Sequence, residues 1–367
     1  MKIICDKSKL LEGINIALKA IPGKSTMVIL EHMVIEAKDN MIKLISNDLE
    51  IGIETIIEGE IEEEGSVAVN AKVFFEIIRK LPSDQVTVVV DENYMINITG
   101  GKSNFNIAAK GTEEFPYLPQ IIKEKSVLIS QFTLKEIIRQ TVFSISDNEN
   151  TKVMTGELLE IHGSRLRLVS LDGHRISIRN VSLKQEYDDV SVIIPGKTLI
   201  EINKILSGGL DDEVSMYFTD KHVLFEFENT IVLSRLIEGE YYKIDKMLST
   251  DYETKINVNK KNLLDCIDRT TLLIRESEKK PVVMDVKDTS MGLAINSALG
   301  SMEEEVEVEK VGKDIMIGFN PKFLIDALRV IDKEEITMYM INAKAPCFIR
   351  DEEESYVYLI LPVNFNV

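Results

Sequence analysis

Several residue types and segments are scarce in this chain of 367 residues. Tryptophan is absent and aromatic residues make up 6% of the chain, which argues against an aromatic cleft of the kind that binds carbohydrates. No apolar run approaches the roughly 18–20 residues that a membrane-spanning helix needs. An acid, Asp6, follows the first methionine too closely for a secretory signal peptide. We therefore expect a protein without membrane association.

Cysteine is also sparse. The three cysteines, Cys5, Cys266 and Cys347, are far apart and odd in number, so they predict neither a disulfide framework nor a metal site. Such cysteine usage suits a reducing compartment, and we expect a cytoplasmic protein. Metal-ligand spacing and glycine-rich phosphate loops are both missing from the sequence. We therefore expect no metal and no cofactor.

Positive charge is in short supply, since the formal net charge is −18. A uniformly acidic surface would disfavour nucleic acid, because phosphates need a basic footprint. Net charge does not reveal where the charges lie, however. The hydrophobic fraction of 44% and the charged fraction of 28% are ordinary for a globular protein. At about 100–200 residues per domain, the length suggests two to four domains.

One pattern recurs six times along the chain. A lysine is followed two and three places later by apolar residues, although Glu12 holds the second slot in the first copy. The six lysines are 61 to 64 positions apart, and they are Lys9, Lys72, Lys135, Lys197, Lys261 and Lys322. Each lysine begins a segment with helical periodicity. The sequence therefore predicts six helices at one spacing.

The clearest helix spans residues 70–82. Asn70 can cap its start, and Pro82 ends it. The apolar stripe is predicted to contain Phe74, Phe75, Ile77, Ile78 and Leu81. In the last helix Asn320 is the predicted cap, and Pro321 occupies the first helical position, where its missing N–H has no cost.

Alternating apolar and polar residues between the helices predict short strands. The clearest runs are residues 85–90, 94–98, 165–169, 222–227 and 356–361. The repeating unit is thus one helix followed by antiparallel strands. The second, fourth and sixth helices match best, since Lys72, Lys197 and Lys322 are 125 positions apart. We predict an α+β protein of three tandem domains, at residues 1–124, 125–250 and 251–367.

The matching helices carry a second basic residue seven places after the first. Positions seven apart lie close to one line on a helix surface, and the pairs are Lys72 with Arg79, Lys197 with Lys204, and Lys322 with Arg329. An ordinary solvated face, with pairs such as Lys72 with Glu76, would also explain one such helix. Six helices with the same bias favour a basic track that contacts phosphates without reading bases.

Two other functions compete with a DNA track. Asp172 and His174 are an acid and a base close together in the chain, and a histidine titrates near neutrality. No nucleophile motif accompanies them, so we predict no catalytic residues and interpret Asp172-Gly173 as a strand turn. The second alternative is a triplicated protein-binding scaffold without DNA contact. Such a scaffold would have no reason to repeat basic residues at three matched positions.

Ser170-Leu-Asp-Gly-His-Arg-Ile176 resembles the Thr-Asp-Gly-His-Arg-Leu signature of the bacterial sliding clamp family, the beta subunit of DNA polymerase III. Residues 70–82 and 318–328 resemble the family's second and sixth helices, and residues 46–50, 115–117 and 358–363 also match. The resemblance implies a non-catalytic processivity factor. Two three-domain protomers would form a head-to-tail homodimeric ring around duplex DNA and tether the replicative polymerase.

The resemblance also assigns sites residue by residue. DNA contacts would fall on Lys24, Lys72, Arg79, Lys152, Lys197, Lys204, Lys322 and Arg329. A pocket for a short peptide would be lined by Met154, Leu171, Gly173, His174, Arg175, Ile176, Tyr242, Lys246, Met247, Asn320, Phe323, Lys344, Pro346, Leu359, Ile360, Leu361, Pro362 and Val363. Phe105 and Ile107 of one protomer would meet Leu272 and Leu273 of the other. Polymerase III catalytic subunit, clamp loader, other polymerases and repair proteins would compete for the pocket.

Overall fold

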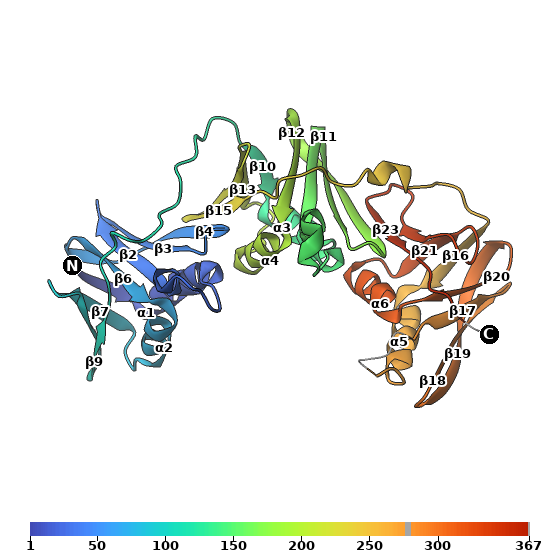
Figure 1. The fold of residues 1–367 in the computed structure, drawn as a ribbon, viewed down its shortest axis with the longest axis horizontal. Helices are drawn as coiled ribbons and strands as arrows, with labels where there is room; N and C mark the ends of the chain where they lie inside the picture. The colour runs from blue at the N-terminus through green and yellow to red at the C-terminus, as the bar shows by residue number, and fades with distance from the viewer. Residues whose placement is uncertain (276–279, 366–367) are drawn as a thin grey trace. The chain divides into compact units, whose positions relative to one another are not determined.

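The computed structural model describes residues 1–275 and 280–365. Within these ranges it contains six α-helices, one for each predicted repeat (Figure 1). They are α1 (Lys7–Ala17), α2 (Ala71–Lys80), α3 (Gln131–Arg139), α4 (Gly196–Ile205), α5 (Lys260–Thr271) and α6 (Pro321–Val330). None of these helices is long and apolar enough to cross a membrane.

The predicted caps are confirmed. The Asn70 side chain accepts a hydrogen bond from the backbone N–H of Val73, and Asn320 accepts one from Lys322. Phe74 and Ile78 of the predicted stripe are fully buried. Phe75 and Ile77 are only half-buried, so the predicted stripe was too wide. At 100° per residue they flank the line through positions 74, 78 and 81.

The strands form three sheets, and every pairing between named strands is antiparallel within the described residues. The five-stranded sheet has the order β5 (Glu60–Glu63), β1 (Lys2–Asp6), β7 (Gln85–Val90), β8 (Met95–Gly100) and β9 (Ser103–Ala108). The eight-stranded sheet has the order β10 (Val127–Ser130), β13 (Glu213–Phe218), β14 (His222–Phe227), β15 (Thr230–Arg235), β4 (Ile51–Ile57), β3 (Met41–Asn47), β2 (His32–Lys38) and β6 (Gly65–Asn70).

The ten-stranded sheet has the order β11 (Gly156–Leu171), β12 (Arg175–Pro195), β23 (Tyr356–Ile360), β22 (Cys347–Arg350), β21 (Glu335–Met340), β16 (Thr254–Asn259), β19 (Gly300–Gly312), β18 (Ser290–Ser297), β17 (Val282–Val286) and β20 (Ile315–Phe319). The prediction of short strands is wrong for β11 and β12, which have 16 and 21 residues. A register shift around Gly163 lets them continue as one ladder.

The chain divides into two compact units. Met1–Thr133 with Glu201–Leu236 forms the first, and Leu134–Ile200 with Ile237–Val367 forms the second. In the first unit, α1 and α2 share one core with strands of two sheets. Its eight-stranded sheet is continuous because β15 pairs with β4, and the Thr55 and Thr230 hydroxyls hydrogen-bond at 2.9 Å. This pairing covers strand edges that would otherwise be exposed.

The second unit contains two cores. One lies among α5, α6 and the strands β16 to β23. The other lies on β11, β12 and β21 to β23, and it includes Ile237 and Ile244 from the segment that follows β15. The two cores share one sheet because β12 pairs with β23, with Arg175 opposite Ile360. The predicted peptide residues are found around this join.

Candidate protein and DNA contact sites

The turn between β11 and β12 confirms the prediction of a strand turn at Asp172-Gly173. Asp172 accepts hydrogen bonds on Oδ1 from the backbone N–H groups of His174 (2.9 Å) and Arg175 (3.1 Å). Gly173 has φ of +87°, a left-handed conformation that glycine adopts at no steric cost. The turn exposes His174 and directs Arg175 inward.

Arg175 is held by three groups. Its Nε donates to Asp172 (2.9 Å), Nη1 donates to Asp326 of α6 (2.7 Å), and Nη2 donates to the Phe143 carbonyl oxygen (2.6 Å). The guanidinium also lies 4.5 Å from the Phe323 ring centroid and 5.4 Å from that of Phe143. These are distances at which a cation and an aromatic face attract.

The burial of Arg175 corrects one expectation. Its side chain is 8% exposed, so it offers little surface to a peptide. It instead holds the turn against α6 through Asp326. Asp326 and Phe143 were missed as members of this site. Asp326 occupies the acidic position that Glu76 and Glu201 hold in the matching helices, but the repeat could not indicate that its partner would be Arg175.

Exposed His174 and half-buried Phe323 form the outer side of the same cluster. Their rings stack with centroids 6.1 Å apart and an interplanar angle of 22°. The backbone N–H of Leu361 donates to the His174 carbonyl oxygen at 2.9 Å, and that of Val363 donates to Gly318 at 2.8 Å. Direct contacts therefore join the turn to α6 and to the segment after β23, and join that segment to the end of β20.

The segment after β15 supplies further predicted residues. Tyr241 and Ile244 pack on the core that contains Leu171, Ile176 and Leu359, with Met154 against its edge. Tyr242 and Met247 are exposed by 40% and 49%, and Leu361 and Val363 by 37% each. Leu171, Ile176, Leu359 and Ile360 are buried and form a base rather than a contact surface.

The remaining predicted peptide residues make fewer contacts with the turn at Asp172-Gly173. Lys246 ends the short 3₁₀ helix Ile244–Lys246, and Lys344 and Pro346 lie between β21 and β22. Pro346 precedes Cys347, which pairs with Ile360, so it is beside the end of β23. Lys344 is exposed and donates its backbone N–H to Asn342. Pro362 is half-buried and Asn320 acts as the helix cap.

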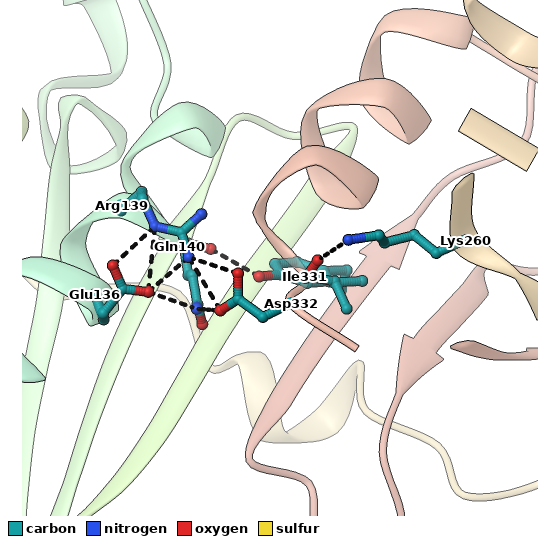
Figure 2. Close-up of polar contacts among 7 residues, drawn as sticks. Glu136, Arg139, Gln140, Lys260, Ile331 and Asp332 are labelled. Carbon is teal, nitrogen blue, oxygen red and sulfur yellow. Dashed lines mark hydrogen bonds and ion pairs between the residues drawn. The ribbon is translucent and has the colours of Figure 1, made fainter. Parts of the chain in front are cut away.

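A polar cluster fastens α3 to the segment after α6 (Figure 2). Arg139 bonds Glu136 at 2.6 Å and Asp332 at 3.2 Å. Gln140 is part of the same contact, since its side chain donates to Asp332 and its carbonyl oxygen accepts from the Tyr358 hydroxyl. The cluster adds contacts between α3 and the strands next to the β12–β23 pairing, around which the predicted peptide residues lie.

One carboxyl close to α3 is completely buried. Glu157 lies 2.6 Å from the Thr141 hydroxyl, which is also 2.7 Å from the Ile137 carbonyl oxygen. A hydroxyl has one hydrogen to donate, so a protonated Glu157 that donates to Thr141 satisfies both contacts. Burial raises the pKa of Glu157 to about 8, in agreement with that arrangement.

All eight predicted DNA-contact residues have exposed side chains. Arg79 is bonded to Glu76 (2.6 Å), Lys204 to Glu201 (2.8 Å), and Arg329 to Asp268 (3.2 Å). The expected alternative pairing of Lys72 with Glu76 is wrong, because Glu76 turns toward Arg79 and Lys80 instead. Exposed Lys24 lies in a loop and exposed Lys152 in the 3₁₀ helix Glu149–Thr155. Lys197 and Lys322 are exposed in the first turns of α4 and α6.

The four predicted interface residues lie on two kinds of surface. Phe105 and Ile107 belong to β9, which among the described residues pairs with β8 alone and is therefore an edge strand. Phe105 is 38% exposed. Leu272 ends α5 and is 77% exposed, while Leu273 is near Gly300 at the start of β19.

In the described part of the chain, no group of three or more His, Cys, Asp or Glu side chains is arranged to hold a metal ion. His174 contacts an aromatic ring and backbone groups.

Comparison with known proteins agrees with this geometry. Three family profiles match in order: the N-terminal domain of the DNA polymerase III beta subunit at residues 1–119, the central domain at 128–243 and the C-terminal domain at 245–364. The beta sliding clamp of Bacillus subtilis is 35% identical over 376 residues, with 99% of each chain covered. That of Staphylococcus epidermidis is 33% identical with the same coverage.

Solved structures give the same result. A putative DNA polymerase III beta subunit from Eubacterium rectale is 58% identical, covers both chains fully and has a TM-score of 0.96. The DNA polymerase sliding clamp from Bacillus subtilis is 34% identical, with full coverage and a TM-score of 0.96. The chain therefore belongs to the beta sliding clamp family, the non-catalytic processivity subunits of DNA polymerase III.

Proposed function

We propose that two copies of this protein close head to tail into a ring around duplex DNA. Each copy would contribute three clamp domains, at residues 1–124, 125–250 and 251–367. The observation that carries the proposal is the set of six helices at one spacing, with basic residues at matched positions, in a chain of this family. Replication takes place on DNA in the cytoplasm of bacteria, so we infer that location.

DNA would be held mainly by topology. The proposed contacts are the exposed residues Lys24, Lys72, Arg79, Lys152, Lys197, Lys204, Lys322 and Arg329. Lysine and arginine contacts to phosphates carry no sequence information and weaken with salt, which suits movement along the duplex. With a formal charge of −18, many acidic residues would lie on other surfaces, where they would discourage non-specific adhesion to nucleic acid.

Polymerase would be tethered through the join between β12 and β23. His174, Phe323, Tyr242, Met247 and the end of β23 present aromatic and aliphatic surface next to polar backbone, a combination that suits a short peptide. Tethering raises the effective concentration of the enzyme at its template. We propose that the polymerase III catalytic subunit, the clamp loader, other polymerases and repair proteins compete for this surface.

The homodimer would form through open strand edges. Among the residues that the structure describes, β9 pairs on one side only, and residues 300–307 of β19 pair with β18 alone, because β16 joins β19 beyond them. Antiparallel addition of β9 to the partner protomer's β19 would satisfy both rows of backbone groups. Phe105 and Ile107 would then meet Leu272 and Leu273 of the partner.

The DNA proposal is tested by replacing Lys72, Lys197 and Lys322 together with glutamate. The variant should lose salt-sensitive retention on circular duplex DNA. The matched control replaces Lys38, Lys221 and Lys287, which lie at the ends of strands, and makes the same charge change. If both triple variants are retained like the unmodified protein, the chain is better described as a protein-binding scaffold without DNA contact.

The peptide proposal is tested separately. Removal of Leu361 to Val363 should abolish binding of a polymerase-derived peptide and leave the mass in light scattering at twice that of the chain. Peptide binding that survives the deletion would rule out this surface. A chain that stays monomeric at micromolar concentration before any change would contradict the ring.

A further inference from the structure

Basic side chains on all six helices are held by carboxylates. The pairs are Lys9 with Glu58 on α1, Arg79 with Glu76 on α2, Arg139 with Glu136 on α3, Lys204 with Glu201 on α4, Arg269 with Glu304 on α5, and Arg329 with Asp268 on α6. Three of the acids stand three places before the base in the same helix. An acid at that spacing faces the base across one helical turn.

On α2 and α6 the carboxylate holds the second of the two matched basic residues and not the first. On α2, Arg79 is bonded to Glu76, whereas the Lys72 ammonium is 3.5 Å from the Gly23 carbonyl oxygen and has no acidic partner in the described residues. On α6, Arg329 is bonded to Asp268, while no ion pair involves Lys322 in residues 1–275 and 280–365. Each of these two helices therefore presents, on the same face, one cation without a carboxylate partner in the described part of the chain and one cation paired with a carboxylate.

The held cations remain accessible. The side chains of Arg79 and Lys204 are 54% and 52% exposed, and that of Glu76 is 47% exposed. An ion pair in water is worth at most about fivefold in an equilibrium constant. A phosphate can thus compete with the carboxylate, but it gains less than it would from a free cation and it also meets the repulsion of the acid.

We infer that Glu76 and Glu201 restrain the DNA contact of the clamp. They act through Arg79 and Lys204 as positioning residues, so the duplex is gripped by fewer cations than the helices carry. The inference rests on the proposed contact between these helices and phosphates. Loose contact has a purpose here, because a ring that holds DNA by closure needs little affinity and slides best when each phosphate contact is easily exchanged.

The test compares Glu76→Gln and Glu201→Gln with Glu12→Gln. Glu12 lies on a helix, α1, is exposed like Glu76, and forms no ion pair within the described residues, so its substitution makes the same charge change without releasing a cation. Affinity for a linear duplex is measured by fluorescence anisotropy from 50 to 200 mM salt. Each released cation should steepen the slope of log affinity against log salt concentration by up to about 0.9.

That slope corresponds to a gain in affinity that is about threefold larger at 50 mM than at 200 mM salt for each substitution. Glu76→Gln in an Arg79→Gln background should have a much smaller effect, since the base 2.6 Å from the acid is gone and Lys80, 3.8 Å away, is the base that remains beside it. Single-molecule tracking should show slower diffusion along DNA for Glu76→Gln and Glu201→Gln.

Two results would overturn the inference. An equal gain from Glu12→Gln, or from Glu76→Gln without Arg79, would assign the effect to net charge. Unchanged slopes in both glutamine variants, together with a loss of binding when Lys72, Lys197 and Lys322 become glutamate, would refute the restraint and leave the DNA contact standing. If that triple variant also binds normally, the DNA contact itself fails.

Discussion

Asp326 joins α6 to the turn that carries His174, and Asp326→Asn tests whether this contact orders the peptide surface. The carboxylate accepts from Arg175 at 2.7 Å, and the two side chains are 21% and 8% exposed. Asparagine keeps the shape and one acceptor oxygen but loses the charge. Water can replace the missing attraction only poorly, because the guanidinium is enclosed by Phe143 and Phe323.

The structure sets the size of the effect. A hydrogen bond to a charged group contributes about 1.5–3 kcal/mol. Complete loss of the partners of a buried charge would cost about 3–5 kcal/mol, but Asp172 still bonds Arg175 at 2.9 Å. We therefore expect Asp326→Asn to lower the free energy of unfolding by about 1.5–3 kcal/mol. If about 1.4 kcal/mol of this loss reaches the peptide surface, the peptide Kd rises tenfold.

The assay is a double-mutant cycle. Unfolding by urea is followed by circular dichroism, since the chain has no tryptophan for fluorescence. Asp326→Asn is measured alone and in an Arg175→Met background, where it should cost less than about 0.5 kcal/mol because the ion pair is already absent. Peptide affinity is measured on the same four proteins. Equal losses in both backgrounds would show that Asp326 acts without Arg175 and would refute the reasoning.

Three further predictions follow from the site. Glu157→Gln should change the pH dependence of stability. The Glu157 carboxyl has a pKa of about 8 in the folded chain and an ordinary pKa of 4.5, so it binds its proton more tightly when folded. The free energy of unfolding therefore falls as the pH rises from 4.5 to about 8 and is constant at higher pH. Glutamine cannot ionise, so urea unfolding should give the variant a growing advantage from pH 5 to pH 8.5, and a constant difference would contradict the protonated state. Phe323→Ala should weaken polymerase-peptide binding at least about tenfold, since a few aromatic anchors dominate such surfaces and Phe323 is a half-buried ring stacked on His174. Phe132→Ala, at a 45% exposed phenylalanine on α3, should bind normally in the same calorimetric titration. Leu272→Glu should shift the light-scattering mass toward the monomer, because it would place a charge in the proposed interface; Leu210→Glu, at a 68% exposed leucine, is the control, and equal behaviour of the two would exclude Leu272 from the contact.

Local features of this protein could be determined from the sequence alone. Asn70 and Asn320 cap their helices because a short acceptor side chain next to free N–H groups is satisfied within three residues. The six helices and the alternating strands follow from periodicities of 3.6 and 2 residues. Asp172-Gly173 forms a turn because both residue types favour it over few bonds. The repeat spacing predicted the triplication without coordinates, and motifs such as residues 170–176 carried the family resemblance.

Only the tertiary structure decided which groups meet across the chain. Glu76 could reach a base three or four places away on either side, and in the folded chain it contacts Arg79 and Lys80 rather than Lys72. Arg175 is a supporting residue because Asp326, 151 positions later, lies within 2.7 Å of it. Glu157 keeps its proton because burial removes the water that would stabilise its charge. Such outcomes depend on distances and solvent exclusion between segments far apart in sequence, which no local pattern encodes.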